Sequence, residues 1–299
     1  MHVFVTGATG FIGSAVVKEL LGAGHSVLGL ARSDATAKTL AGTGAAVHRG
    51  ELTDLESLKS GAAQCDGVIH TAFIHDFSKF AENAAIDKAA IEAMGAILAG
   101  SNRALIVSSG TAGLAVGQVA TEDMPPPTMS PRASETAVFS FTGQGVRTMA
   151  IRLSPAVHGY SDQGFKAGFA SVMLGAARQK GVSPYPGDGK NRWNAVHVSD
   201  AARLYRLALE NGKAGSRYHA VGDESIPVKD IAEAIGKKLN LPVTSIAPDK
   251  TAEHFGFLAM FVGLDIPASS AKTQAELNWT PTGIGLLADI EQATSFAGV

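Results

Sequence analysis

The first half of the chain alternates short apolar runs, rich in β-branched residues, with longer stretches in which apolar side chains recur every three or four residues. The short runs have the length and composition of strands, and the longer stretches have the spacing of amphipathic helices. A repeated strand–helix–strand order predicts a parallel sheet covered by helices on both faces. The expected strands are His2–Thr6, Ser26–Ala31, Ala46–His48, Gly67–Thr71, Ala104–Ser108 and Thr148–Leu153.

The second half of the chain is organised differently, because the alternation stops after Leu153. The segment Ser154–Trp193 is rich in glycine, proline and aromatic residues and contains one stretch with helical spacing, Phe169–Arg178. Further along, the pattern predicts a strand at AVHV, a helix at Asp200–Glu210, a strand at RYHAV and a helix at Val228–Leu239.

Together these elements predict an α/β fold: a doubly wound parallel Rossmann sheet with a smaller C-terminal substrate-binding lobe. We expect residues 1–153 and 194–221 to form the dinucleotide-binding Rossmann domain, and residues 154–193 and 222–299 to form the smaller lobe. That lobe should pack at the carboxyl edge of the sheet, where open α/β folds bind their ligands.

The composition argues against two classes of partner. The 299-residue chain has a formal net charge of −2 and no lysine or arginine cluster longer than a pair, so we expect it to bind neither nucleic acid nor a membrane. Its longest apolar run, Phe255–Leu264, is shorter than the roughly 20 residues of a membrane span. We expect this run to pack in the core of the smaller lobe, with a lid or a subunit contact as the alternatives.

Cysteine usage bears on the compartment. Cys65 is the only cysteine, so no intrachain disulfide can form, and we interpret it as a small buried residue rather than a nucleophile. A chain without disulfides fits a reducing compartment, and the N-terminus leads directly into a strand without a basic leader. We therefore expect a cytoplasmic protein.

A glycine-rich loop follows the first expected strand. In the sequence TGATGFIG, Gly7, Gly10 and Gly13 recur at intervals of three between a strand and a helix. The first glycine permits a tight turn, the second lets backbone N–H groups approach a pyrophosphate, and the third lets the helix pack close to the sheet. Because the loop lies in a strand–helix–strand unit, we interpret it as a dinucleotide-binding loop.

The end of the second strand bears on which dinucleotide binds. An acid there usually bonds the ribose 2′-hydroxyl of NAD, whereas an arginine accommodates the 2′-phosphate of NADP. This chain has Arg32 and Ser33, with Asp34 one or two positions too late. A guanidinium binds phosphate through two parallel hydrogen bonds, so we predict NADP(H), with NAD as the alternative cofactor. A solvated surface arginine is the other interpretation.

Several further motifs join the glycine loop in a recognisable order. Together they resemble the short-chain dehydrogenase/reductase superfamily, as an atypical member close to its extended, NAD-dependent epimerase/dehydratase-like group. The motifs that carry the resemblance are TGATGFIG, Glu51–Asp54, VIHTAF at Val68–Phe73, LIVSSGT at Leu105–Thr111, RLSPAVHG at Arg152–Gly159, GDGKNRWNAVHVSDAA at Gly187–Ala202 and WTP at Trp279–Pro281.

The resemblance implies positions for the cofactor and the substrate. Glu51 and Leu52 would flank the adenine, Thr71 to Phe73 would line the middle of the cofactor, and Arg192 and His197 would face the substrate. The region from Pro155 to His158 would lie near the nicotinamide. The expected cofactor-binding residues are Gly7, Thr9, Gly10, Phe11, Ile12, Gly13, Arg32, Ser33, Glu51, Leu52, Thr71, Ala72, Phe73, Ser108 and Pro155.

The resemblance fails at the catalytic residues. Members of the superfamily use a Tyr-x-x-x-Lys pair, but the best register places Pro131 and Glu135 at these two positions, and no tyrosine precedes Tyr160. Proline has no proton to donate, and an anion raises rather than lowers the pKa of a neighbouring acid. Asp87 also replaces the asparagine that usually helps to hold the lysine. We therefore expect the standard proton relay to be absent.

Other side chains are candidates to replace that relay. Ser109 and Thr111 end the fifth expected strand, where a hydroxyl would bond a substrate oxygen, and His158 and Tyr160 lie in the loop expected to pass the nicotinamide. Each also has a structural interpretation, such as capping a strand end.

Three further positions have an open role. His70 is expected beneath the cofactor, and His75, Asp76 and Asp87 form a polar cluster only if the fold brings them together. Arg132 either replaces the missing lysine or lies exposed on the surface. No pair of residues has the spacing of a zinc site, so we expect no metal.

Two functions of different classes follow. The first is an NADP(H)-dependent oxidoreductase that acts on a small carbonyl-like substrate, favoured by the motif GDGKNRW. The second is an NADP(H)-binding sensor or regulatory protein with little or no turnover, favoured by the loss of tyrosine and lysine. A sugar-nucleotide epimerase would need a relay that takes and returns a proton, which Pro131 and Glu135 do not provide. The resemblance also implies a homodimer.

Overall fold

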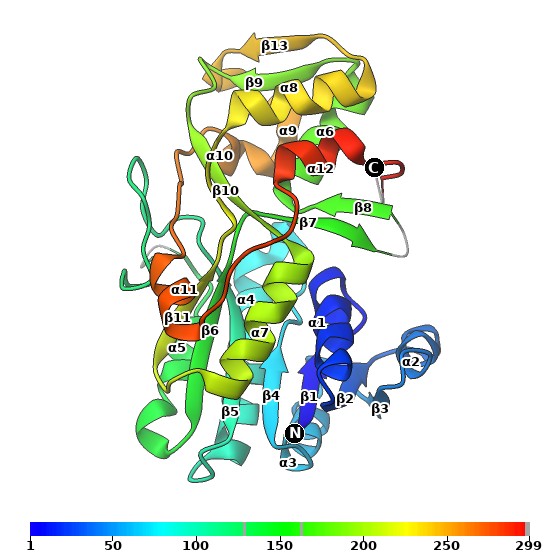
Figure 1. Ribbon diagram of the computed structural model, residues 1–299, viewed down its shortest axis with the longest axis vertical. Coiled ribbons are helices and arrows are strands. Elements are labelled where there is room, and N and C mark those ends of the chain that lie inside the picture. The colour runs from blue at the N-terminus through cyan, green and yellow to red at the C-terminus, as the bar shows by residue number, and fades with distance from the viewer. Residues whose placement is uncertain (128–129, 162–163, 297–299) are drawn as a thin grey trace.

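The computed structural model describes residues 1–127, 130–161 and 164–296. It has a large lobe built on a seven-stranded parallel sheet and a small lobe above it (Figure 1). The large sheet has the spatial order β11 (Ser216–Ala220), β6 (Arg147–Leu153), β5 (Ala104–Gly110), β4 (Gly67–His70), β1 (His2–Thr6), β2 (Ser26–Ala31) and β3 (Ala46–Arg49). This strand order confirms the predicted Rossmann sheet.

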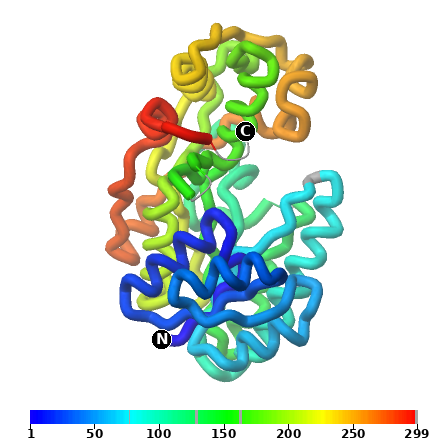
Figure 2. The backbone as a smooth tube through the Cα atoms, turned by 90° about the vertical axis from the view of Figure 1, so that its right-hand side faces the viewer, coloured from blue at the N-terminus to red at the C-terminus, as the bar shows by residue number. Residues whose placement is uncertain are grey.

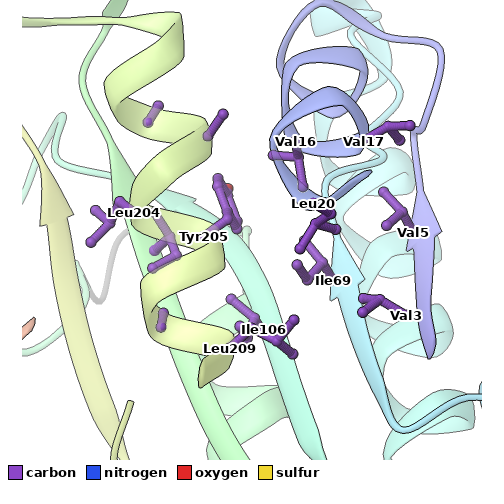
Figure 3. Packing of buried hydrophobic residues seen from close by; sticks show 14 of the residues in the cluster. Val3, Val5, Val16, Val17, Leu20, Ile69, Ile106, Leu204, Tyr205 and Leu209 are labelled. Atoms are coloured by element: carbon purple, nitrogen blue, oxygen red, sulfur yellow. The ribbon is translucent and has the colours of Figure 1, made fainter. Parts of the chain in front are cut away.

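Helices cover both faces of the large sheet. Neighbouring residues of a strand point to opposite faces, so Val3 and Val5 of β1 pack on one side and Phe4 on the other. Figure 3 shows α1 and α7 packed on the first face, beside Ile69 and Ile106. The helices of the large lobe are α1 (Phe11–Gly22), α2 (Asp34–Ala41), α3 (Leu55–Ala63), α4 (Phe80–Leu98), α5 (Ser134–Phe139), α7 (Val198–Asn211) and α11 (Ala271–Leu277).

The small lobe has its own sheet and its own core. Four strands pair in the order β12 (Asp223–Pro227), β10 (Arg192–His197), β7 (Ala156–Ser161) and β8 (Gly164–Ala167), and β13 (Val243–Ile246) pairs with β9 (Ser183–Pro186). Trp193 and Leu174 are fully buried in the core of this lobe. Its helices are α6 (Phe169–Lys180), α8 (Val228–Leu239), α9 (Thr251–Phe255), α10 (Ala259–Val262) and α12 (Leu286–Gln292).

The expected elements agree closely with the observed ones. The predicted helix Val228–Leu239 has the bounds of α8, and α6 and α7 extend the predicted helices by one to two residues at their ends. Cys65 is buried, as expected. The run Phe255–Leu264 contributes Phe255, Leu258 and Val262 to the core of the small lobe, which confirms its expected packing there.

The structure differs from the expected lobe boundaries in two places. Residues 194–197 belong to β10, which pairs with β7 and β12 in the small sheet rather than with the large one. Trp279 packs in the core of the large lobe, where its indole N–H donates to the carbonyl of Asp200 at 3.0 Å. Burial of an indole N–H favours such a partner, and only the tertiary fold brings α7 to Trp279. Residues 297–299 of the expected smaller lobe lie outside the described residues.

None of the helices within the described ranges combines the length and the apolar composition needed to cross a bilayer.

Candidate functional site

The glycine loop between β1 and α1 is closed so tightly that two of its positions have no room for a side chain. Gly7 has a φ of 69°, and a Cβ built there would lie 2.7 Å from the Thr71 hydroxyl oxygen. A Cβ on Gly13 would lie 2.0 Å from the carbonyl oxygen of Gly7. The Gly10 N–H donates to that same carbonyl at 2.9 Å. Both glycines are therefore required for α1 to begin directly beside the turn.

The beginning of α1 is a favourable site for an anion. Gly10 is the N-cap and has no side chain to cap the helix. By helix geometry, the N–H groups of Phe11, Ile12 and Gly13 have no acceptor within the helix, and the helix dipole is positive at this end. Thr9 lies in the loop just before them and is partly buried. The loop thus fits the pyrophosphate of a dinucleotide, which would bind at the N–H groups that begin α1.

The end of β2 carries an exposed cation. Arg32 is exposed, and its side chain has no hydrogen bond or ion pair to another described residue. The acid that follows is paired on the surface, because Asp34 accepts a 2.7 Å bond from Arg49 at the end of the neighbouring β3. Ser33 accepts the Thr36 N–H at 3.2 Å and caps α2. Glu51 and Leu52 follow β3, with Glu51 exposed and Leu52 partly buried.

The loop after β4 lies across the glycine turn. The Thr71 hydroxyl donates to the carbonyl of Thr6 at 2.8 Å, and the Ala72 N–H donates to the Thr6 hydroxyl oxygen at 3.4 Å. The guanidinium carbon of Arg132 lies 4.3 Å above the centre of the Phe73 ring. These contacts place Thr71, Ala72 and Phe73 next to the phosphate-binding loop.

A largely buried chain of hydrogen bonds includes Arg132 and Ser134. These two residues are the sequence neighbours of Pro131 and Glu135, which stand where the tyrosine and lysine are expected. Asp87 accepts bonds from the His70 ring at 3.2 Å and from the Ser134 hydroxyl, and the other nitrogen of His70 lies 2.8 Å from the Thr6 hydroxyl oxygen. Ser134 in turn accepts from Arg132 at 3.0 Å. Burial favours a raised pKa for Asp87, but these hydrogen bonds and the nearby positive charges hold the pKa below its usual value.

Arg132 itself is fixed at the end of β5. One guanidinium nitrogen donates to the carbonyl of Ser108 at 2.9 Å, next to Ser109. The side chain is half-buried, so a permanent positive charge stands between the Phe73 ring and the carboxyl end of β5.

Glu135 forms a second buried network. Its carboxylate accepts two bonds from Arg152, at 2.7 and 2.8 Å, and one from Arg217 at 3.0 Å. Burial alone would raise the pKa of Glu135, but Arg152, the Ser109 hydroxyl and Arg217 lower it. Ser109 is half-buried, and its hydroxyl bonds the Glu135 carboxylate.

Two other hydroxyls of β5 and its loop are committed to structural bonds. The Ser108 hydroxyl donates to the carbonyl of His70 at 2.9 Å and lies 2.7 Å from the Tyr205 hydroxyl. Burial raises the pKa of Tyr205, so this phenol stays protonated. The Thr111 hydroxyl is buried and donates to Asn194 at 3.0 Å, which ties the loop to β10.

His158 and His197 lie side by side in paired strands, with ring centres 5.4 Å apart. His158 is 0% exposed and bonds Asp289 of α12 at 2.7 Å, while its other nitrogen is buried without a partner among the described residues. The ring of His197 accepts the Ser199 N–H at 3.3 Å and caps α7. Burial and the neighbouring His158 lower the pKa of His197.

Three other expected positions have definite partners. Tyr160 is exposed, and its hydroxyl oxygen accepts the Thr294 N–H at 2.8 Å. The Pro155 carbonyl accepts the Phe169 N–H at 2.9 Å. The guanidinium of Arg192 donates two bonds to Asp265, at 2.9 and 2.8 Å, which raise the pKa of Arg192.

The polar cluster considered from the sequence does not assemble. His75 packs edge-on against the Phe73 ring at 5.4 Å, and burial and the Arg132 charge lower its pKa. Asp76 instead caps the short turn at Ser78, and Asp87 is buried beside His70. In the described part of the chain, no three histidine, cysteine or acidic side chains are grouped closely enough to hold a metal ion.

Sequence reasoning missed the partners that decide these roles. Asp265, Asp289 and Tyr205 lie 73 to 131 residues from the side chains that they bind. No local pattern marks them, because each pair is formed only when distant strands and helices pack together.

Comparison with known proteins identifies the family. The NAD dependent epimerase/dehydratase family model matches residues 3–221. An uncharacterized protein of Schizosaccharomyces pombe is 48% identical over 99% of this chain and 100% of its own length. Vestitone reductase of Medicago sativa is 27% identical over 79% of this chain and 81% of its own.

Solved structures show the same fold. UDP-glucose 4-epimerase of Thermus thermophilus, in complex with NAD, superimposes with a TM-score of 0.75 at 20% identity and covers 97% of each chain. Because the family match runs from β1 through β11, and so spans every strand of the large sheet, the chain belongs to the NAD dependent epimerase/dehydratase family.

Proposed function

We propose that the protein is an NADP(H)-dependent reductase of a small molecule that carries a carbonyl group. The observation that supports this cofactor is the exposed Arg32 at the end of β2, beside an Asp34 that is paired with Arg49. An available guanidinium favours the 2′-phosphate of NADP, whereas a paired acid is poorly placed to accept the 2′-hydroxyl of NAD.

The described residues would hold two parts of the cofactor separately, the central pyrophosphate and the phosphate on the adenosine ribose. The N–H groups at the start of α1 would bind the pyrophosphate, and Arg32 with Ser33 would bind the ribose phosphate. Phe73 and Pro155 would line the cofactor between the glycine loop and the carboxyl ends of β5 and β6. When bound, the nicotinamide supplies the hydride.

Ser109 and Arg132 would act on the substrate oxygen in place of the missing relay. The Ser109 hydroxyl would turn from Glu135 to donate a hydrogen bond to the carbonyl oxygen. The fixed charge of Arg132 would stabilise the negative charge that develops there as hydride reaches the carbon. Arginine keeps its own proton at neutral pH, so the resulting alkoxide takes its proton from water.

The test of the cofactor is a calorimetric titration of the wild type and Arg32→Ala with NADPH and NADH. We expect the wild type to bind NADPH at least about tenfold more tightly than NADH, because charged hydrogen bonds contribute roughly 1.5–3 kcal/mol. Arg32→Ala should lose most of this preference and keep its affinity for NADH. Lys237→Ala, in the small lobe, removes the same charge far from β2 and serves as the control. Equal binding of the two cofactors by the wild type would refute the NADP(H) assignment.

A binding protein with little turnover is the second candidate. The buried chain from Asp87 through Ser134 to Arg132 favours it, because these groups bond one another beside the expected relay. Incubation of the protein and NADPH with a panel of aldehydes and ketones, followed by absorbance, distinguishes the two. Tight NADPH binding without oxidation across the panel would support the second function.

A further inference from the structure

We propose that the substrate has an uncharged, flat apolar body, such as an aryl ring, which binds against aromatic side chains of the small lobe. This inference rests on the proposed reductase function, since it places that body next to the reacting carbonyl. It assigns the chain a hydrophobic substrate rather than a sugar nucleotide.

Three aromatic rings gather around the ring of Phe169, the first residue of α6, and make a group of four. Its ring centre lies 5.1 Å from that of Phe261, 6.1 Å from that of Trp193 and 6.3 Å from that of Phe257. These separations are typical of interacting aromatic pairs, and a fifth ring inserted beside them gains the same kind of contact. We call these four residues the aromatic wall.

The aromatic wall adjoins the expected nicotinamide position. The Phe169 N–H donates to the carbonyl of Pro155, and Gly168 lies so close to this segment that a Cβ there would be 2.4 Å from the same oxygen. Pro155 follows β6, whose Leu153 pairs with Gly110, the residue after Ser109. A short run of bonded backbone therefore connects the proposed oxygen-binding residue to the aromatic wall.

The loop after β5 reaches the wall from the other side. Thr111 is bonded to Asn194, the neighbour of Trp193, and Ala112 packs on the same core as Phe169 and Phe261. The segment from α9 to α10 contains Phe257 and Phe261. In Figure 2 this segment lies on the same side of the molecule as the beginning of α4. Loops of the large lobe and rings of the small lobe thus come together at one place.

Part of the wall remains open to a ligand. Phe257 is 38% exposed, and Phe169 and Phe261 are only partly buried. A separate groove of about 590 Å³ lies along α6 against α9 and is lined by none of the four wall residues, so the apolar body would contact only the partly exposed rings themselves.

The charge beside the wall argues against an anionic substrate. Arg192, the neighbour of Trp193, is the cation that resemblance places toward the substrate. It donates two of its five guanidinium N–H groups to Asp265, whose carboxylate also accepts the Arg192 backbone N–H at 2.7 Å. The Asp265 carboxylate offsets the charge of Arg192, so the pair attracts a diphosphate less than an unpaired arginine would, whereas an uncharged ring needs no cation.

The test measures binding by equilibrium dialysis, with 4-phenyl-2-butanone and UDP-glucose as probes, on the full chain with and without saturating NADP⁺. We expect the aryl ketone to bind more tightly than UDP-glucose. Phe257→Ala, which removes an exposed ring, and Phe169→Leu, which keeps an apolar side chain, should each weaken ketone binding by about tenfold. Phe139→Leu, on α5 beside Arg217 and away from the wall, should leave it unchanged.

Each outcome separates this inference from the proposed function. Suppose that the chain binds neither NADP⁺ nor UDP-glucose, but binds the ketone in a way that depends on Phe257 and Phe169. This result would support the apolar site and reject the reductase. Binding of NADP⁺ together with tighter binding of UDP-glucose would overturn the apolar site alone. Ketone binding that is absent, or equal in all three variants and the wild type, would also overturn it.

Discussion

In the variant Gly13→Ala, helix propensity and packing at the glycine loop have opposite effects on the free energy of unfolding. Alanine is about 1 kcal/mol better than glycine inside a helix, so propensity alone predicts a more stable protein. The structure predicts the reverse, because the new Cβ would lie 2.0 Å from the Gly7 oxygen and 2.6 Å from the Gly7 carbonyl carbon. Both atoms belong to the backbone of a tight turn, so no side-chain rotation relieves the overlap.

The size of the effect follows from how far α1 must move. Cβ atoms do not approach other atoms closer than 3.0 Å, so the start of the helix must shift by about 1 Å or more. Overpacking of this kind costs about 1–3 kcal/mol, which outweighs the gain in propensity. The same shift misaligns the N–H groups of Phe11 and Ile12, and losing two charged hydrogen bonds lowers affinity for NADPH by about 100-fold or more.

Gly22→Ala is the matched control, since it lies at the other end of α1 and a Cβ there meets nothing within 4 Å. Urea unfolding followed by circular dichroism gives the free energy of unfolding, and calorimetry gives the dissociation constant of NADPH. Gly22→Ala should be neutral or up to about 1 kcal/mol more stable, with unchanged binding. If Gly13→Ala behaves in the same way as Gly22→Ala in both measurements, the close approach is not what holds the loop.

Two further predictions concern buried groups of the large lobe. Glu135→Gln leaves the fully buried Arg152 without its carboxylate and should cost about 3–5 kcal/mol in urea unfolding at pH 7, whereas Glu56→Gln, which breaks only an exposed pair, should change stability by less than about 1 kcal/mol. The pKa of Glu135 is lower in the folded protein than its unfolded value of 4.5, so its carboxylate stabilises the fold above about pH 4.5. This stabilisation is lost as the pH falls through the folded pKa. If the difference in unfolding free energy between wild type and Glu135→Gln does not shrink below pH 4.5, this reasoning is wrong. Burial raises the pKa of Cys65 to about 11, so its thiol is about one-thousandth ionised at pH 8 and should resist iodoacetamide in the folded protein but react in urea; rapid labelling without urea would disprove it.

The sequence predicted the large sheet well because its signals are local. The β-branched runs gave β1 and β2 with their observed bounds, and the helical spacing gave α8. The glycine loop could be interpreted for the same reason, since Gly7 and Gly13 are required by contacts within one strand–turn–helix unit. Short strands of the small lobe, such as β8 and β9, have four residues each and no such pattern.

The catalytic candidates were harder to judge, because their partners come from distant parts of the chain. Thr111 and His158 fit a reactive role by position, yet the fold gives them Asn194 and Asp289 as partners. The sequence indicated that Pro131 and Glu135 replace the tyrosine and lysine, but it gave no sign that Glu135 would bond a buried Arg152. Such pairs depend on how the strands and helices pack, which periodicity does not report.

The interleaving of the two sheets along the chain makes the lobes inseparable by any single cut. Along the chain, β7, β8 and β10 of the small sheet come before β11, the last strand of the large sheet, and β12 of the small sheet comes after it. The chain then returns to the large lobe at Trp279 before α12 closes the small one. A ribosome therefore finishes neither half before it has begun the other, and recombination at one point cannot exchange the substrate-side half between relatives while leaving the nucleotide-side half whole.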